Sequence, residues 1–338
     1  MKLYAFRSSL LVFMFLLLSC SKSPVQKDFP TVDGPEAEKL LIEAEGYIVY
    51  EFPVGGMRAI SLGNLKEIIV RRDGDSSNGV VHTLSGPDQT GTIAYIENHM
   101  ARPNSKHKLK TIKLDGKNDE EIFSRSGDAL WEHVAGDFLA LSPVGGFVAL
   151  ITNVKGNDIG TLEIWDIKKK KSLDVKLSAL NAPLSWFPDG TTLVYTGVRY
   201  ENGKSVPGVF IYDLKENNNT FFAEGGGSLV TPDGKSIIVG HSDRSFSIIN
   251  YKTKDSRPLK VPGLVRFPIG FAASNRVLAF SLPTKGGPAQ WTKNNSPLVG
   301  PKPMIAVKII DLDTGEFQTV LNSIDPRHKA SFGTITKK

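Results

Sequence analysis

The segment Trp186–Tyr195, with the sequence WFPDGTTLVY, combines a tight turn with a short apolar run. Proline presets the backbone for a turn, aspartate bonds the backbone that follows it, and glycine accepts a positive φ. The apolar run is too short for a helix and is typical of a buried strand. The segment Val230–Val239 repeats the pattern as VTPDGKSIIV, and looser copies occur at 84–96 and 141–150. This recurrence indicates a fold built from repeated β units.

The spacing of the copies identifies the size of the unit. The turn prolines at positions 87, 143, 188 and 232 are 56, 45 and 44 residues apart, which is the size of a propeller blade. A second marker, an apolar strand that ends in a polar residue before a hairpin turn, occurs at Lys113, Asp166, Asp213, Asn250 and Asp311. Each blade is therefore expected to hold four antiparallel strands. The Pro-Asp-Gly turn joins the first two strands, and the second hairpin joins the last two.

Five blades are predicted, over residues 80–124, 130–176, 182–222, 227–261 and 266–321. The strand patterns of 47–70 fit three strands of a sixth blade, and 331–336 would supply its missing inner strand. Such closure would remove exposed sheet edges. We expect an all-β propeller of six four-stranded blades over residues 47–338, with seven blades as the alternative.

The first nineteen residues have the character of a signal peptide. Lys2 and Arg7 precede an unbroken apolar run at Leu10–Leu18, which is too short to span a bilayer. Residues 20–46 that follow are expected to form a tether at 21–34 and a short helix at 35–46, which would pack on the domain or dock to a partner. Loss of residues 1–19 would lower the net charge from +6 to about +4.

Cys20 is the only cysteine of the chain, so no intramolecular disulfide is possible. The sequence Leu17-Leu18-Ser19-Cys20 resembles the lipobox of bacterial lipoproteins, and the alternative is a stray cysteine in an ordinary signal peptide. The resemblance implies cleavage before Cys20 and acylation there, with two or more acyl chains as a stable membrane anchor. Ser21 after the cysteine implies the outer membrane, by the sorting rule of enteric bacteria.

The repeats resemble the WD40-like repeats of the TolB type. The resemblance rests on Pro-Asp-Gly at 188–190 and 232–234, on the segment 311–316 and on Trp165-Asp166, and it covers about 47–336. It implies a propeller and says little about function. TolB-type propellers bind a peptidoglycan-associated lipoprotein, but no contact residue carries over. TolB itself carries an extra amino-terminal α/β domain, whereas only 26 residues separate Cys20 from Tyr47 in this sequence.

The candidate binding surface lies opposite the Pro-Asp-Gly turns. The number of residues from the turn marker to the strand-end marker ranges from 18 in the fourth of these repeats to about 38 in the fifth. The residues beyond the shortest repeat fall between strands two and three. We expect long loops there, at 97–108, 152–160, 197–208 and 283–303, and call this end the loop face and the other the turn face. The candidate binding residues are Arg102, His107, Arg199, Tyr200, His241, Arg244 and Trp291.

Signatures of an enzyme are mostly absent. The chain has no Gly-x-Ser-x-Gly, His-Glu-x-x-His or Walker motif, its six histidines are not at metal-ligand spacing, and no cofactor is predicted. We therefore expect a non-catalytic binding or scaffold module at the outer membrane, facing the periplasm, with a protein or envelope component as its partner and no nucleic acid. A subunit role in a larger envelope assembly is also open. The enzymatic alternative is a metal-dependent lactonase or hydrolase with ligands at the channel mouth, for example Glu97, His99, Glu201 and Asp243.

Overall fold

A computed structural model describes residues 44–52, 56–64, 66–72, 80–99, 105–127, 138–154, 159–201, 203–243, 245–259, 265–281, 305–324 and 330–333. Met1–Thr31 form a unit separate from Val32–Lys338, and only the second contains described residues. The predicted signal peptide, Cys20, the tether and nearly all of the predicted helix at 35–46 lie outside them. No helix in the described ranges has the length and apolar character needed to cross a membrane.

The described residues form strands and turns, which confirms the all-β fold. Four sheets have four antiparallel strands each, in the orders β25-β1-β2-β3, β4-β5-β6-β7, β17-β18-β19-β20 and β21-β22-β23-β24. Their strands are β1 (Tyr47–Phe52), β2 (Gly56–Ser61), β3 (Glu67–Arg71), β25 (Ala330–Gly333), β4 (Val80–Leu84), β5 (Thr92–His99), β6 (Ser105–Lys113), β7 (Glu120–Gly127), β17 (Gly226–Val230), β18 (Ser236–Gly240), β19 (Phe246–Asn250), β20 (Ser256–Pro258), β21 (Val265–Ala273), β22 (Arg276–Ser281), β23 (Ile305–Asp311) and β24 (Phe317–Ile324).

The fifth sheet has nine strands in two halves. One half holds β8 (Leu139–Leu141), β9 (Phe147–Thr152), β10 (Ile159–Asp166), β11 (Lys171–Ser172) and β12 (Leu177–Leu180), and the other holds β13 (Ser185–Trp186), β14 (Thr192–Glu201), β15 (Lys204–Asp213) and β16 (Asn218–Glu224). Strand pairing between the halves is limited to Ala179↔Gly197. We interpret each half as one blade, which gives six blades, numbered here from the amino terminus: β1–β3 with β25, β4–β7, β8–β12, β13–β16, β17–β20 and β21–β24.

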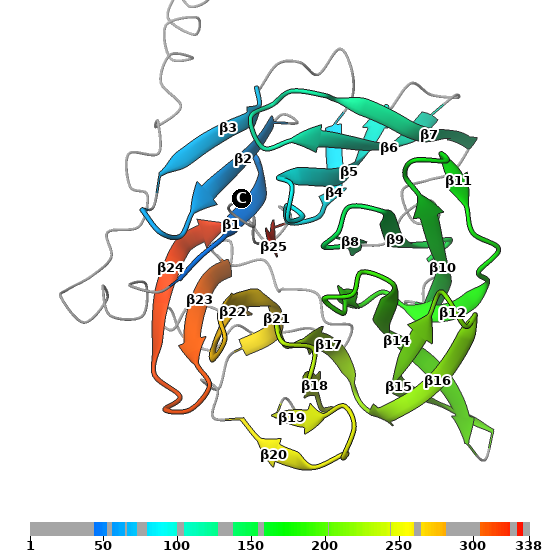
Figure 1. Ribbon diagram of the computed structural model, residues 1–338, viewed down its shortest axis with the longest axis vertical. Coiled ribbons are helices and arrows are strands. Elements are labelled where there is room, and N and C mark those ends of the chain that lie inside the picture. The colour runs from blue at the N-terminus through cyan, green and yellow to red at the C-terminus, as the bar shows by residue number, and fades with distance from the viewer. Residues whose placement is uncertain are drawn as a thin grey trace, which may run out of the picture. The chain divides into compact units, whose positions relative to one another are not determined.

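The core lies between these blades, which are arranged in a ring in Figure 1. The buried apolar residues of the described ranges fall into six clusters, and each cluster combines two neighbouring blades. One cluster joins Ile48 of the first blade to Leu278 of the sixth, so the packing closes on itself. The second strand of a blade can be an apolar run because both of its faces are covered, as in β9 with the sequence FVALIT, whereas β10 alternates half-buried and buried residues.

The Pro-Asp-Gly turns join the first two strands of their blades, as predicted. The side chain of Asp189 accepts hydrogen bonds from the backbone N–H groups of Thr191 at 2.8 Å and Thr192 at 2.9 Å, and Gly190 has a φ of +70°. The second hairpin is tied to this turn because the N–H of Leu214 donates to the carbonyl of Thr191. The equivalent bond is made by the N–H groups of residues 114, 167, 251 and 312. Both turns therefore lie at one end of each blade, the turn face.

The carboxy-terminal strand completes the first blade. β25 pairs with β1 from Tyr50↔Ala330 to Tyr47↔Gly333, which confirms the predicted inner strand for the residues that are described. The ring of Phe332 packs on the cluster between the first and sixth blades. A Cβ placed on Gly270 would lie 2.2 Å from this ring, so glycine is needed there to admit it. Figure 1 shows β25 beside β1 although the two are far apart in the sequence.

The prediction of loops between strands two and three was wrong for much of 197–208. β14 and β15 stay paired from Thr192↔Asp213 to Glu201↔Lys204, so both strands are ten residues long. Glu201 pairs with Lys204, so two residues connect the strands; the sequence Asn-Gly is typical of such a connection, and Gly203 has a φ of +76°. The predicted loop at 97–108 is also shorter, because β5 extends to His99 and β6 begins at Ser105. The segment 283–303 lies outside the described residues.

Candidate functional site

The β14–β15 hairpin extends beyond the core at the loop face. Its residues are buried from Thr192 to Gly197, whereas most of 198–207 is half-buried or exposed. Four residues of strand past Gly197 correspond to about 13 Å. Tyr200, near the tip, is 74% exposed, the largest value among the large apolar and aromatic side chains found exposed in the described residues. The structure therefore places this predicted residue where a partner can reach it.

Arg199, the neighbouring predicted residue, is held by its surroundings. Its guanidinium donates to a carboxylate oxygen of Glu224 at 3.0 Å and forms an ion pair with Glu201. It also lies 4.3 Å from the centre of the Phe221 ring, a cation–π contact. Because β16 anchors Arg199 in this way, the hairpin is braced next to Tyr200, which projects from a supported strand.

The other described candidates lie within their own blades. His107 on β6 is buried, and its Nδ1 contacts the side-chain oxygen of Asn98. His241 follows β18, and its Nε2 lies 2.8 Å from the hydroxyl of Ser247. His107 belongs to the second blade, Arg199 to the fourth and His241 to the fifth, so they do not form one compact cluster. Arg102, Arg244 and Trp291 lie outside the described residues.

Glu97 is the centre of a buried ionic network between the first and second blades. It is 1% exposed, and one carboxylate oxygen lies 3.0 Å from Nη1 of Arg71 and 3.3 Å from Nζ of Lys110. Its other oxygen contacts His99. Nearby, the phenol of Tyr95 donates to Asp119 at 2.7 Å, and burial followed by this bond raises the pKa of the phenol. Two cations thus offset the cost of burying this carboxylate.

The residues of the enzymatic alternative do not converge in the described parts of the chain. Glu97 and His99 contact each other, Glu201 is paired with Arg199, and Asp243 accepts hydrogen bonds from the backbone and hydroxyl of Ser245. No group of three or more histidine, cysteine, aspartate or glutamate side chains that could hold a metal ion is found among the described residues.

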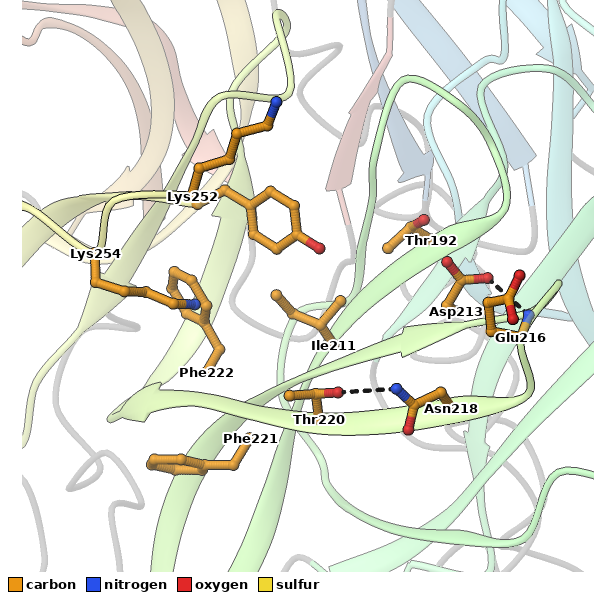
Figure 2. A pocket seen from close by; sticks show the side chains of 11 residues that line it. Thr192, Ile211, Asp213, Glu216, Asn218, Thr220, Phe221, Phe222, Lys252 and Lys254 are labelled. Carbon is orange, nitrogen blue, oxygen red and sulfur yellow. Dashed lines mark hydrogen bonds between the residues drawn. The ribbon is translucent and has the colours of Figure 1, made fainter.

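A cavity of about 450 Å³ lies at the turn face, between the fourth and fifth blades. Its floor contains Ile211 and Phe222, and Figure 2 shows Lys252 and Lys254 on one side of Ile211 and Asp213 and Glu216 on the other. The remaining lining residues are Thr192, Asn218, Thr220, Phe221 and Tyr251. This site was not predicted from the sequence, because the segments of irregular length lie on the opposite face.

Lys254 is the best-defined polar group of the cavity. Its ammonium lies 3.8 Å from the centre of the Phe222 ring and 5.6 Å from that of Tyr251. Burial lowers its pKa. The two rings are themselves neighbours, with centroids 6.3 Å apart. The cavity thus combines an apolar, aromatic floor with cationic and anionic walls.

Comparisons with known proteins identify the fold. TolB from Acinetobacter baumannii superposes with a TM-score of 0.58 at 15% identity, over 85% of this chain and 66% of that chain. A putative TolB from Agrobacterium tumefaciens gives 0.50 at 13% identity, over 87% and 99%. An oligogalacturonate lyase in complex with manganese gives 0.52 at 14% identity, over 82% and 74%.

No protein-family model matches the chain, and no curated protein does so either. At identities of 13–15% the structural likeness establishes the fold alone. The chain spans 66% of the length of the A. baumannii TolB structure. The similar solved structures include two TolB proteins, and this chain has the same β-propeller fold.

Proposed function

We propose that this protein is a lipid-anchored propeller of the cell envelope that binds a protein or envelope component through its loop face, without catalysis. In this account Cys20 carries the acyl anchor and residues 21–34 form the tether, with the outer membrane as the site and the periplasm as the side that the propeller faces. The resemblance to TolB-type propellers supports a binding role. One observation at the β14–β15 hairpin supports the binding role most directly.

That observation is the exposure of Tyr200 on a braced strand. Tyrosine offers a large contact area, it has few rotatable bonds, and it is enriched at protein interfaces. Arg199 is already fixed by Glu224 and Phe221, so the hairpin needs little ordering when a partner binds. The flanking charges of Glu201 and Lys204 at the tip would form the polar rim of such an interface.

The binding role is tested by partner recovery from native membranes with a single side chain changed. Tyr200→Ser should weaken partner binding by about 10- to 30-fold, the effect of removing an interface hot spot. Ile69→Ser is the matched control, because Ile69 is 55% exposed but lies on β3, the outer strand of the first blade. Quantitative co-purification of cross-linked partners measures both. Equal recovery from wild type and Tyr200→Ser would contradict the assignment of this hairpin.

The anchor is tested separately. Incorporation of labelled palmitate into the wild-type protein but not into Cys20→Ser, together with release of the variant from the membrane fraction, is the expected result. A Cys20→Ser protein that still incorporates label and stays in membranes would refute lipidation at this residue. Deletion of 284–302, which removes Trp291, tests the second predicted part of the loop face, and unchanged partner recovery would remove that segment from the binding surface.

A further inference from the structure

The cavity at the turn face occurs at a position where the repeats can be compared residue by residue. In the second blade Thr111 pairs with Glu120, and Thr111 lies two residues before the strand-end marker Lys113. In the fourth blade the equivalent residue Ile211 pairs with Thr220. Thr220 therefore occupies in the fourth blade the position that Glu120 occupies in the second.

The blade that follows supplies the same kind of residue at both junctions. Lys170 in the third blade and Lys254 in the fifth each lie four residues after the strand-end marker of their blade. Both adopt the left-handed backbone conformation, with φ of 51° and 66°. The corresponding residues of the fourth and sixth blades are Asn217 and Gly315, the residue types that favour this conformation. Lysine adopts this conformation less readily than asparagine or glycine, and both lysines reach back to the preceding blade.

The two lysines differ in their partners. Nζ of Lys170 lies 2.7 Å from a carboxylate oxygen of Glu120, so the junction of the second and third blades is closed by an ion pair. At the junction of the fourth and fifth blades Thr220 replaces that glutamate, and none of the ion pairs between described residues includes Lys254. The cavity of about 450 Å³ opens at this junction. The repeat therefore shows where an anionic group is missing.

We propose that this cavity is a second binding site, on the turn face, for an acidic peptide segment of a protein partner, whose carboxylate takes the place that Glu120 fills in the second blade. The ligand carboxylate pairs with Lys254 and accepts a hydrogen bond from the Thr220 hydroxyl. An adjacent aliphatic side chain of the ligand covers Ile211 and the ring of Phe222. Lys252 adds a second cation on the same wall, as Figure 2 shows.

The opposite wall fits a peptide backbone. Glu216 lines the cavity across from the lysines, and Asp213 lies beside it with one oxygen bonded to the N–H groups of Lys215 and Glu216. These carboxylates accept hydrogen bonds from N–H donors, which a peptide supplies at every residue except proline. A peptide with an aliphatic residue beside a glutamate therefore matches the cavity: its carboxylate faces the lysines, its aliphatic side chain faces Ile211 and Phe222, and its backbone N–H groups face Glu216.

The test uses the full-length protein and two capped peptides, acetyl-Ala-Leu-Glu-Ala-amide and the same peptide with glutamine in place of glutamate. Binding is followed by NMR titration up to about 10 mM peptide, because a site of this size for a short peptide is expected to bind weakly, with a dissociation constant of about 1 mM. The glutamate peptide should bind about tenfold more tightly than the glutamine peptide, since only the former forms the ion pair.

Three variants locate the effect. Lys254→Asn, which introduces the residue type found at position 217, should lower the affinity for the glutamate peptide about tenfold. Thr220→Glu should also abolish binding, because it supplies the missing carboxylate from within the chain. Lys170→Asn is the matched control at the equivalent position and should leave binding unchanged. Thermal melting of each variant, monitored by circular dichroism, verifies that it is folded.

Four results would overturn the proposal. They are equal binding of the two peptides, unchanged binding by Lys254→Asn, no binding of the glutamate peptide up to about 10 mM, and binding of an oligogalacturonate in a Lys254-dependent manner without binding of the peptide. The last result would identify an acidic sugar as the ligand. None of these outcomes depends on Tyr200, so the loop-face interaction is tested independently of this cavity.

Discussion

Replacement of Phe332 by alanine tests how the propeller is closed. The ring of Phe332 packs on the cluster that joins the first and sixth blades, and it fits between Gly46 and Gly270. Truncation of a fully buried phenylalanine costs about 3–5 kcal/mol, and because this ring is only partly buried we expect about 2–3 kcal/mol. For a domain of this size that loss lowers the melting temperature by about 4–6 °C.

The assay is guanidinium unfolding of the full-length protein, followed by tryptophan fluorescence, with the free energy of unfolding taken from the midpoint and slope. Phe317→Ala is the matched control, because that ring is 47% exposed and contacts only the ammonium of Lys308 among the aromatic and cation–π partners of the described residues. It should cost about 1 kcal/mol or less. If the two variants lose the same free energy, the carboxy-terminal strand does not hold the ring closed in the way described.

Three further predictions follow from the packing and the turns. Gly86→Ala places a Cβ 2.0 Å from a backbone carbonyl of β25 and should cost about 3 kcal/mol, whereas Gly146→Ala, which meets nothing within 4 Å, should be nearly neutral in the same unfolding assay. Glu97→Ala leaves the buried Arg71 and the half-buried Lys110 without their carboxylate and should cost about 3–5 kcal/mol, while Glu120→Ala breaks an exposed pair and should cost below about 1 kcal/mol. Hydrogen bonding by the Lys235 backbone lowers the pKa of Asp233 in the folded protein. The stabilisation from this carboxylate is therefore complete above about pH 4 and is lost as the pH falls through the lower folded-state pKa. The unfolding midpoint of Asp233→Asn should consequently decrease less between neutral and acidic pH than that of the wild type.

The repeated turns made the fold predictable from sequence. Pro-Asp-Gly at 188–190 and 232–234 has a local cause, since the aspartate bonds the next backbone N–H groups and the glycine adopts a positive φ. Local chemistry of this kind is readable without knowledge of the tertiary structure. The closing strand at 331–333 was predictable for another reason, because the first blade lacked one strand and an open edge is unfavourable.

The shape of the loop face was less predictable. The excess residues at 197–208 indicated a long connection, and this was interpreted as a loop and not as an extension of the two strands. Pro207 pairs with Val198 on β14 and lies one residue beyond Gly208, where the pairing of β15 with β16 ends. The Asn-Gly pair at 202–203 was the local signal for a hairpin, and it was available in the sequence.

The turn-face cavity required the pairing register. The exchange of Glu120 for Thr220 is visible only when the outer strands of two blades are aligned, and those strands are the least regular part of the repeat. The cavity also depends on the conformation of Lys254, whose φ of 66° carries the side chain back over Phe222. The uniform turns of this face gave no sign of a binding site in the sequence, whereas the structure shows a difference between side chains at equivalent positions.

Site-specific photo-cross-linking in native membranes tests the central claim, that the loop face binds a partner, most directly. A photoreactive phenylalanine analogue at position 200 should give a discrete cross-linked product, and the same analogue at position 69 should not, although both sites are exposed. A product at position 69 alone, equal products at the two positions, or no product at position 200 would contradict the account.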